Sequence, residues 1–335
     1  MVNLSIIIVN YKSLPQIRDC LNSIFMRKPD LQIEVIIVNN DELQERDNQI
    51  LNRYPEVKWS DMGYNAGFAR ANNEGIRRAS GEVFLLLNPD TIIPQGALDK
   101  SFRQLINSDY IACGVQLLNE DASPQISGNY FITGGLNYLL PLPYIGNCMK
   151  WIARLFSIKK PHVAEASSLV EVDWINGAFI MVKEWAARKA GLMDEDFFLY
   201  AEEVEWCARL RKIGKLCILG DVQVFHLQGM TANETFISKG KGYYNLFDRK
   251  GLQIMLSNLV RIRKQYGIFW FLFILMIYTI DIPVFFAGNL FSMLFPKRSR
   301  VYTLDQAAGF TKNVFFVWSK SSPILLNRPY FYKVL

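Results

Sequence analysis

The chain has 335 residues, of which 50% are hydrophobic and 20% are charged, and its formal net charge is +6. This hydrophobic content provides a sizeable core and excludes a disordered chain. The basic excess is modest and is concentrated around a C-terminal apolar block, which favours an anionic lipid surface as a partner and argues against nucleic acid.

The first part of the chain alternates short apolar runs with segments of helical periodicity. Apolar runs at 4–9 and 33–38 predict buried strands, and residues 14–25 have the spacing of a helix. A short strand at 57–59 and a helix at 67–79 follow. Strands that alternate with helices in this way predict a doubly wound, mostly parallel sheet.

The next apolar run, Val83 to Leu87, ends at Asn88-Pro89-Asp90. Five consecutive apolar residues predict a central strand that is buried on both faces, and the proline ends its ladder. The carboxylate of Asp90 then lies at the carboxyl end of the strand, where ligands bind in open α/β sheets. The same residues also suit a turn and a helix cap, so both interpretations remain open.

Regular patterns continue after this motif, with one long interruption. Residues 96–105 fit a helix and residues 111–118 a strand. Between 119 and 171 prolines and glycines interrupt the periodicity, which predicts an irregular insertion of the kind that often carries function. Order returns with a strand region at 172–182 and a short helix at 183–190.

Three glutamates open the helix that follows. Glu205 precedes Arg209 by four residues, which favours a surface ion pair, and Glu202 is expected on the same solvated face. Glu203 shares a face with Cys207, which predicts burial, and buried carboxylates are rare unless they are paired or functional. A first-turn acid that complements the helix dipole is the favoured interpretation for Glu202 and Glu205, and it is the alternative for Glu203.

A further apolar run, 222–225, predicts a strand that ends at His226, one of two histidines in the chain. A histidine at a strand end is a candidate metal ligand. A satisfied core histidine is the open alternative.

These landmarks, in this order, resemble the family 2 glycosyltransferases of the GT-A fold, and within them the rhamnosyltransferase-like branch. The resemblance covers residues 3 to 250. The motifs that carry it are Ser5-Ile-Ile-Ile-Val-Asn-Tyr11, Asn65-x-Gly67-Phe-Ala with Asn72-Asn73-x-Gly75, Leu85-Leu-Leu-Asn-Pro-Asp-Thr91, Trp174-x-Asn-Gly-Ala178, Phe197-Phe-Leu-Tyr-x-Glu-Glu-x-Glu-x-Cys207 and Phe225-His226.

The resemblance implies a site for a nucleotide-sugar donor. The matching residues are Asn10, Tyr11, Asn39, Asn65, Gly67, Asn72, Asn73, Asn88 and Asp90. Asn39 takes the place of a family aspartate that contacts the base, and its amide oxygen can accept a hydrogen bond from a uracil or thymine imide. Asn72 stands where many relatives have an arginine.

The resemblance also implies a metal ion. Asn88-Pro89-Asp90 matches the family's D-x-D motif with asparagine in place of the first aspartate, which makes Asp90 the principal carboxylate ligand and His226 a second ligand. Oxygen ligands and phosphates suit Mg²⁺ or Mn²⁺. The ion would neutralise charge on the departing nucleoside diphosphate.

The catalytic and acceptor residues follow from the same comparison. Glu203 matches the general base of the family's E-D motif, with glutamate in the usual aspartate position, and Glu202 is its rival. An inverting transfer needs one carboxylate to take the proton of the attacking hydroxyl. Trp174, Asn176 and Gly177 match the acceptor- or sugar-binding segment.

The C-terminal apolar block, 267–295, contains a single charge, Asp281, which together with Pro283 divides it into two halves. Each half is shorter than the roughly 20 residues that cross a bilayer, and a span would bury Asp281 at a cost of about 3 kcal/mol. The basic residues on its two sides are Arg261, Arg263 and Lys264, and Lys297, Arg298 and Arg300. We therefore expect a monotopic hairpin or in-plane helices on a membrane, with helices packed on the catalytic domain as the alternative.

Together these observations predict a GT-A domain at 1–250 and a helical membrane-association region at 251–335. Scattered cysteines and an N-terminal apolar run too short for a signal peptide favour the cytoplasm. The expected function is an inverting, metal-dependent transferase at the cytoplasmic face of a bacterial inner membrane. It would move one sugar, from dTDP-rhamnose, to a lipid-linked glycan. The alternatives are a UDP-sugar donor and a catalytically weak nucleotide- or sugar-binding membrane protein.

Overall fold

The computed structural model describes residues 2–26, 29–131, 138–156, 162–227, 235–238, 245–293 and 302–334. The chain forms two compact units. Unit 1 comprises Met1–Phe131, His162–Phe198 and Glu202–Thr231, and unit 2 comprises Ile132–Pro161, Leu199–Ala201 and Ala232–Leu335. By sequence, unit 1 has 19 basic and 27 acidic residues, whereas unit 2 has 18 basic and 4 acidic residues. The modest net charge of the chain therefore combines an acidic unit of charge −8 with a basic unit of charge +14.

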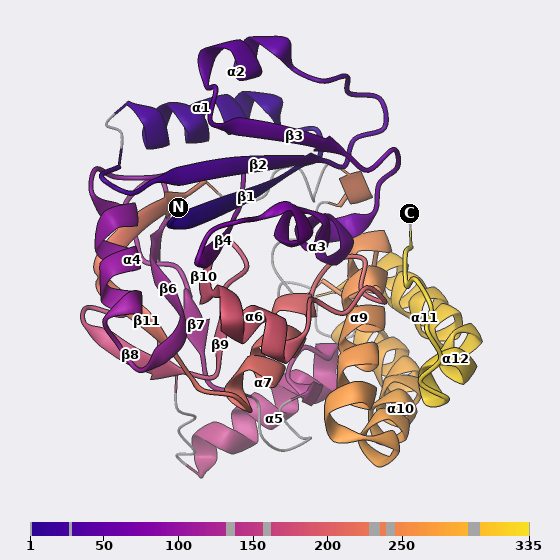
Figure 1. The fold of residues 1–335 in the computed structure, drawn as a ribbon. Helices are drawn as coiled ribbons and strands as arrows, with labels where there is room; N and C mark the ends of the chain where they lie inside the picture. The colour runs from indigo at the N-terminus through magenta and orange to yellow at the C-terminus, as the bar shows by residue number, and fades with distance from the viewer. Residues whose placement is uncertain are drawn as a thin grey trace. The chain divides into compact units, whose positions relative to one another are not determined.

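Unit 1 is built on a mixed, mostly parallel sheet (Figure 1). Its strands are β1 Leu4–Asn10, β2 Ile33–Asn39, β3 Val57–Asp61, β4 Val83–Leu87, β5 Thr91–Ile92, β6 Tyr110–Leu118, β8 Leu169–Val172, β10 Phe179–Lys183 and β11 Lys215–His226. Their order is β3-β2-β1-β4-β10-β6-β11-β5, and β8 pairs with β11. The first four strands are parallel, as are β6 and β11, whereas β10, β5 and β8 run antiparallel to their neighbours. The expected sheet is confirmed.

The helices of unit 1 pack on this sheet. They are α1 Leu14–Phe25, α2 Asn48–Arg53, α3 Gly67–Arg78, α4 Ala97–Ile106, α6 Glu184–Ala190 and α7 Glu202–Arg211. Ile6 and Ile8 of β1 lie in one core cluster with Ile17 of α1. Ile7 faces α3, where a Cβ added to Gly75 would lie 2.3 Å from its Cγ2 atom. The central strand β1 is therefore buried on both faces, as its continuous apolar run predicts.

A buried carboxylate, Glu34, connects the starts of three strands. It accepts hydrogen bonds from the Ser5 hydroxyl at 2.6 Å and from the backbone N–H of Ser80 at 2.7 Å, and it pairs with Lys58 at 2.6 Å. Burial raises the pKa of this carboxyl group, but the hydrogen bonds from Lys58, Ser5 and Ser80 outweigh it and hold the pKa at about 2.

The prediction of an irregular segment at 119–171 is wrong in three places. Strand β7, Gly128–Asn129, pairs with β9, Trp174–Ile175. Helix α5 covers Pro143–Leu155, and strand β8 begins at Leu169. Proline interrupts the interior of a helix but suits the first turn, where Pro143 lies in α5. The fixed φ of proline is helical, and no hydrogen bond from a backbone N–H is needed at this position. Residues 132–137 and 157–161 lie outside the described residues.

Unit 2 is helical in the part that the structure describes. Its helices are α5, α9 Arg249–Tyr266, α10 Ile268–Met293, α11 Leu304–Ser319 and α12 Ser321–Leu325. Helix α10 contacts α5, α9 and α11. Phe285 of α10 and Phe310 of α11 are fully buried, with ring centroids 5.8 Å apart.

The predicted break at Asp281 and Pro283 is wrong, because α10 continues through both residues. An internal proline costs about 3 kcal/mol, and the packing of α10 on three neighbouring helices offsets this cost. Asp281 itself is 0% exposed. The basic residues expected after the block, at 297–300, lie outside the described residues.

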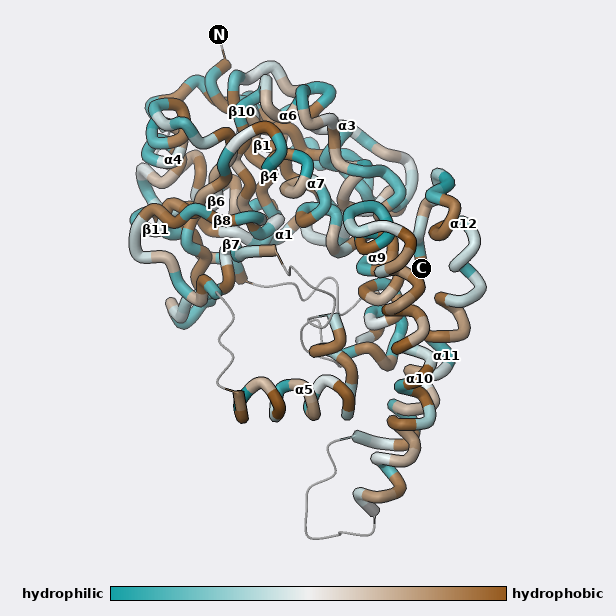
Figure 2. Tube along the Cα trace, turned by 90° about the horizontal axis from the view of Figure 1, so that it is seen from below, coloured by the Kyte–Doolittle hydropathy of each residue, from teal (hydrophilic) through white to brown (hydrophobic). Residues whose placement is uncertain are grey.

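Helix α10 has several exposed, large apolar side chains, here called the apolar stripe, and Figure 2 shows that much of the helix is apolar. Its large side chains are Ile268, Phe269, Leu272, Met276, Ile280, Val284, Leu290 and Phe291. By length and composition the segment Ile268–Ser292 could cross a membrane, with a mean hydropathy of 2.2. The core helix of a soluble protein can pass the same test, so the helix alone does not establish a span.

Candidate active site

Polar side chains gather where the parallel strands end. Asn10 and Asn39 close β1 and β2, and Nδ2 of Asn10 donates to Oδ1 of Asn39 at 2.8 Å. Nδ2 of Asn39 donates to Oδ1 of Asp61, at the end of β3, at 2.9 Å. Tyr11 follows β1 and is half-buried. The sequence therefore predicted the edge correctly, while contact of these residues with a base or ribose stays a prediction.

Sequence reasoning missed Asn40, whose buried side chain organises the turn before α3. Its Oδ1 accepts from the backbone N–H of Ala66 at 2.8 Å, and its Nδ2 donates to the carbonyl oxygen of Gly67 at 3.0 Å. Gly67 has φ +76°, and a Cβ there would lie 2.2 Å from the carbonyl oxygen of Phe198. Oδ1 of Asn65 accepts from the N–H of Gly67 at 3.2 Å. Gly67 is thus required by the backbone itself.

The next two residues predicted to bind the nucleotide-sugar donor, Asn72 and Asn73, lie on α3 and are both buried. Nδ2 of Asn72 donates to the carbonyl oxygen of Phe68, one turn back, at 2.9 Å. Asn73 exchanges two hydrogen bonds of 2.9 Å with the backbone of Met193 and donates to Glu195 at 3.0 Å. The structure shows both amides in contacts with protein atoms, and their contact with a donor stays a prediction.

His226 lies beside the Asn88-Pro89-Asp90 motif because β11 pairs with β5, directly after that motif. Nε2 of His226 is 3.4 Å from Oδ1 of Asp90 and 3.3 Å from Nδ2 of Asn88. Among the described residues, no group of three or more His, Cys, Asp or Glu side chains is placed to hold a metal ion. The expected pair, Asp90 and His226, is nevertheless brought together.

Gln125, which sequence reasoning also missed, orients the ring of His226. Nε2 of Gln125 donates to the carbonyl oxygen of His226 at 2.7 Å, so its amide oxygen faces Nδ1 of the ring at 3.0 Å. A carbonyl oxygen only accepts, so Nδ1 carries a hydrogen, and in the neutral ring the lone pair is on Nε2. Metal-ligating histidines are commonly held in this way.

The Asp90–His226 pair fits a divalent cation. A nitrogen and an oxygen 3.4 Å apart can both lie about 2.1 Å from one ion. Mg²⁺ is usually bound by one or two protein ligands, with water and substrate phosphates completing its shell. One carboxylate and one imidazole at this edge are compatible with an ion whose other ligands are water and a diphosphate.

The glutamates of α7 differ from the prediction. Glu202 is 3% exposed and Glu205 is 7% exposed, so both are buried, whereas Glu203 is half-buried. The predicted pair of Glu205 with Arg209 is confirmed at 2.8 Å. It is not solvated, because Arg209 also donates to the carbonyl oxygen of Ala190 at 2.8 Å, under the loop that follows α6. Helical spacing does not reveal which segment covers a helix.

The half-buried Glu203 lies next to Gly177. A Cβ added to Gly177 would lie 3.8 Å from the Cβ of Glu203 and 3.6 Å from the ring of Phe68. The β9–β10 turn is fixed by Asn176, whose Oδ1 accepts from the N–H of Ala178 at 3.0 Å. The carbonyl oxygen of Ala178 in turn accepts from the N–H of Asn88 at 3.0 Å. The candidate acceptor segment begins at the half-buried Trp174. It therefore lies between Glu203, the candidate general base, and the Asn88-Pro89-Asp90 motif.

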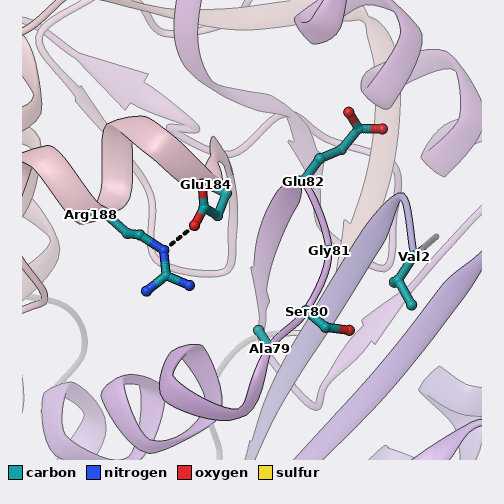
Figure 3. A pocket seen from close by; sticks show the side chains of 7 residues that line it. All are labelled: Val2, Ala79, Ser80, Gly81, Glu82, Glu184 and Arg188. Carbon is teal, nitrogen blue, oxygen red and sulfur yellow. Dashed lines mark hydrogen bonds and ion pairs between the residues drawn. The ribbon is translucent and has the colours of Figure 1, made fainter.

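A separate pocket of about 230 Å³ lies at the opposite end of β4 (Figure 3). It is lined by Ala79, Ser80 and Gly81, before the strand, and by the ion-paired Glu184 and Arg188 of α6. Ligands of open α/β sheets bind at the carboxyl ends of the strands. This pocket is at the amino end and is not the candidate active site.

An open mixed sheet with polar groups at the ends of β1, β2 and β4, and with acids of α7 beside the β9–β10 turn, is the arrangement of the GT-A fold. The solved structure of GalNAc-T7 with UDP, GalNAc and Mn²⁺ has the same fold, with a TM-score of 0.51 at 13% identity over 79% of this chain and 51% of that chain.

The sequence comparisons place a family 2 glycosyltransferase domain in the N-terminal part of the chain. Residues 5–161 match the sequence model of Glycosyl transferase family 2, so the resemblance inferred from the motifs is confirmed. The low-salt glycan biosynthesis hexosyltransferase Agl10 of Haloferax volcanii is 28% identical over 63% of this chain and 62% of its own length. The N-acetylglucosaminyl-diphospho-decaprenol L-rhamnosyltransferase of Mycobacterium tuberculosis is 23% identical over 67% and 75%. The dTDP-rhamnosyl transferase RfbF of Shigella flexneri is 25% identical over 68% and 70%.

Proposed function

We propose that the chain transfers one sugar, with inversion, from a nucleoside-diphosphate donor to a lipid-linked glycan. The observation that carries the proposal is the meeting of Asp90 and His226 at the carboxyl edge of the sheet, 3.4 Å apart. The relatives RfbF and the mycobacterial enzyme, named for dTDP-rhamnose and for a decaprenol-linked substrate, support rhamnose and a lipid acceptor. A UDP-sugar is the second candidate donor.

Glu203 is proposed as the general base. A base must reach the acceptor hydroxyl, and Glu203 is more accessible than Glu202, which is 3% exposed. Gly177 faces Glu203 without a side chain, and even a Cβ at this position would stay 3.8 Å from the Cβ of Glu203. The attacking oxygen would lose its proton to Glu203 as the bond to the anomeric carbon forms opposite the departing diphosphate.

The test of this assignment is a pair of isosteric substitutions. Glu203→Gln keeps the shape and removes the basicity, so transfer should fall by about 100-fold or more while nucleotide binding is retained. Glu202→Gln serves as the matched control and should retain more of the turnover. Near-normal transfer by Glu203→Gln would exclude it as the base.

Mg²⁺ or Mn²⁺ is proposed as the cofactor, with Asp90 and His226 as its protein ligands. When bound, the ion would supply positive charge that stabilises the departing diphosphate. Calorimetric binding of dTDP, UDP and GDP, each with and without Mn²⁺, tests both the donor and the metal. A metal-dependent preference for dTDP supports rhamnose, and a preference for UDP moves the assignment to the second donor.

A peripheral attachment to an anionic membrane on its cytoplasmic side is proposed for unit 2. Its charge of +14 and the apolar stripe on α10 are the two features that bind such surfaces. Vesicles of phosphatidylglycerol and phosphatidylcholine should sediment the protein, and vesicles of phosphatidylcholine alone should sediment much less. Phe269→Ser should weaken binding. Leu43 is a comparably exposed apolar residue of unit 1, and Leu43→Ser should not weaken binding.

A binding protein with weak catalysis is the alternative from a different class. The substituted positions Asn39 and Asn72 favour it, because their amides already bond to protein atoms. This alternative would be supported if the protein binds dTDP, UDP or GDP but neither transfers nor hydrolyses the corresponding sugar donor.

A further inference from the structure

The turn that leads into α7 has an unusual backbone. Tyr200 and Ala201 have φ values of +73° and +69°. L-residues with side chains rarely adopt this region, and two in succession need support from the surrounding structure. The chain continues directly from this turn into Glu202 and Glu203, the first residues of α7. The turn therefore determines the position of the proposed base, Glu203.

The support comes from α9, in the same unit as the turn. The Ser257 hydroxyl donates to the carbonyl oxygen of Leu199 at 2.8 Å. Ser257 also accepts a hydrogen bond of 3.1 Å from Nε2 of Gln253, one turn earlier on the helix. Residues Leu199–Ala201 thus belong to unit 2, although they lie between two segments of unit 1.

Gln253 connects this contact to the C-terminal segment. Its Nε2 donates to the carbonyl oxygen of Tyr332 at 2.9 Å, and its Oε1 accepts from the N–H of Val334 at 3.0 Å. Gln253 is 0% exposed and Ser257 is 1% exposed. A buried amide and a buried hydroxyl are costly unless each is hydrogen-bonded, and a satisfied network of this kind specifies a single geometry.

We infer that Gln253 and Ser257 are positioning residues for the reaction. Ser257 holds the Leu199–Ala201 turn to α9, and Gln253 holds Ser257 and the segment Tyr332–Val334. In this way they fix the start of α7 and the direction of the Glu203 carboxylate. The inference rests on the proposed function, in which Glu203 is the base. It gives α9 a role in the proposed reaction, in addition to the proposed membrane attachment of unit 2.

The test compares Ser257→Ala and Gln253→Leu with a matched control, Asn313→Leu. Asn313 is also buried in unit 2, and its amide donates to the carbonyl oxygens of Leu246 and Asp248, both at 2.9 Å. The Asn313→Leu variant therefore loses a similar number of buried hydrogen bonds, none of which involves Leu199. All three variants are measured in the full chain with Mn²⁺, dTDP-rhamnose or UDP-N-acetylglucosamine, and a lipid extract as the acceptor source.

Both test variants should reduce turnover roughly 10- to 100-fold, because a misplacement of about 1 Å has effects of this size. The Michaelis constant for the donor should stay within about twofold, since the donor candidates lie on other elements. Amide hydrogen exchange at residues 199–203 should accelerate in these variants and not in Asn313→Leu. The control should instead accelerate exchange around residues 246–248.

The outcomes separate the inference from the proposed function. If exchange at 199–203 is unchanged, or if turnover falls no further than in the control, Gln253 and Ser257 are structural only and the inference is wrong. If the wild-type chain transfers no sugar while Ser257→Ala still loosens residues 199–203, the proposed function is wrong and the role in holding the turn remains.

Discussion

Asp281 provides a sharp test of how unit 2 is packed. The residue is fully buried, and neither carboxylate oxygen has a hydrogen-bond partner among the described residues. Burial raises its pKa from 3.8 to about 7. Replacing it with asparagine keeps the shape and removes the ionisable group.

The raised pKa determines the sign of the effect. Between pH 3.8 and about 7 the folded protein keeps the proton of Asp281 and the unfolded chain releases it. The stability contributed by the protonated group is complete below pH 3.8 and is lost at about 1.4 kcal/mol per unit as the pH rises from 3.8 to about 7. The loss above pH 7 amounts to about 4 kcal/mol as an upper bound. Asp281→Asn should therefore stabilise the protein at pH 8 and have little effect at pH 4.

The assay is urea unfolding of wild type and variant at several pH values between 4 and 8, in one detergent buffer. The difference in unfolding free energy between the two proteins at each pH cancels the contributions of all other titrating groups. Asp305→Asn, an exposed acid in the first turn of α11, is the control and should change stability by less than about 1 kcal/mol. A stabilisation by Asp281→Asn that is independent of pH would refute the reasoning.

Three other substitutions have defined outcomes. Gly67→Ala should lose more than about 3 kcal/mol of stability or fail to fold, because the new methyl group would meet the carbonyl oxygen of Phe198; thermal unfolding measures this. Glu34→Gln should lower stability by up to about 3 kcal/mol at neutral pH, since the folded pKa is about 2, and the difference should vanish as the pH falls from 4.5 towards 2. An unchanged difference at pH 3 would contradict the assignment. Gln125→Leu should weaken Mn²⁺ binding about 10-fold or more, measured by calorimetry with dTDP present, because the tautomer of His226 is no longer fixed; an unchanged affinity would show that Gln125 does not act through the ring.

The sheet and its carboxyl edge could be predicted because continuous apolar runs mark strands that are buried on both faces. Val83 to Leu87 is such a run, and all five of its residues are buried. Once these strands are parallel, the polar residues that follow them must lie at one edge. Asp90 and His226 come together for this reason, although 135 positions separate them in the sequence.

The remaining features depend on tertiary contacts that carry no local signal. Asn40 and Gln125 bond to backbone atoms of distant segments, and an asparagine or glutamine in a loop sequence is ordinarily solvent-exposed. The burial of Glu202 depends on which segments cover α7. The continuity of α10 through Pro283 similarly depends on packing, which outweighs the local preference for a break.

The charge difference between the units supports a division of roles. An acidic unit repels both a nucleoside diphosphate and an anionic lipid surface, so donor binding to unit 1, at −8, needs a counter-cation such as the proposed metal. Unit 2, at +14, attracts the same lipid surface, and the Debye length of about 8 Å at physiological salt confines this attraction to charges near the surface. The apolar stripe on α10 lies in the attracted unit. In the proposed attachment, electrostatic attraction and apolar contact therefore act on the same part of the chain.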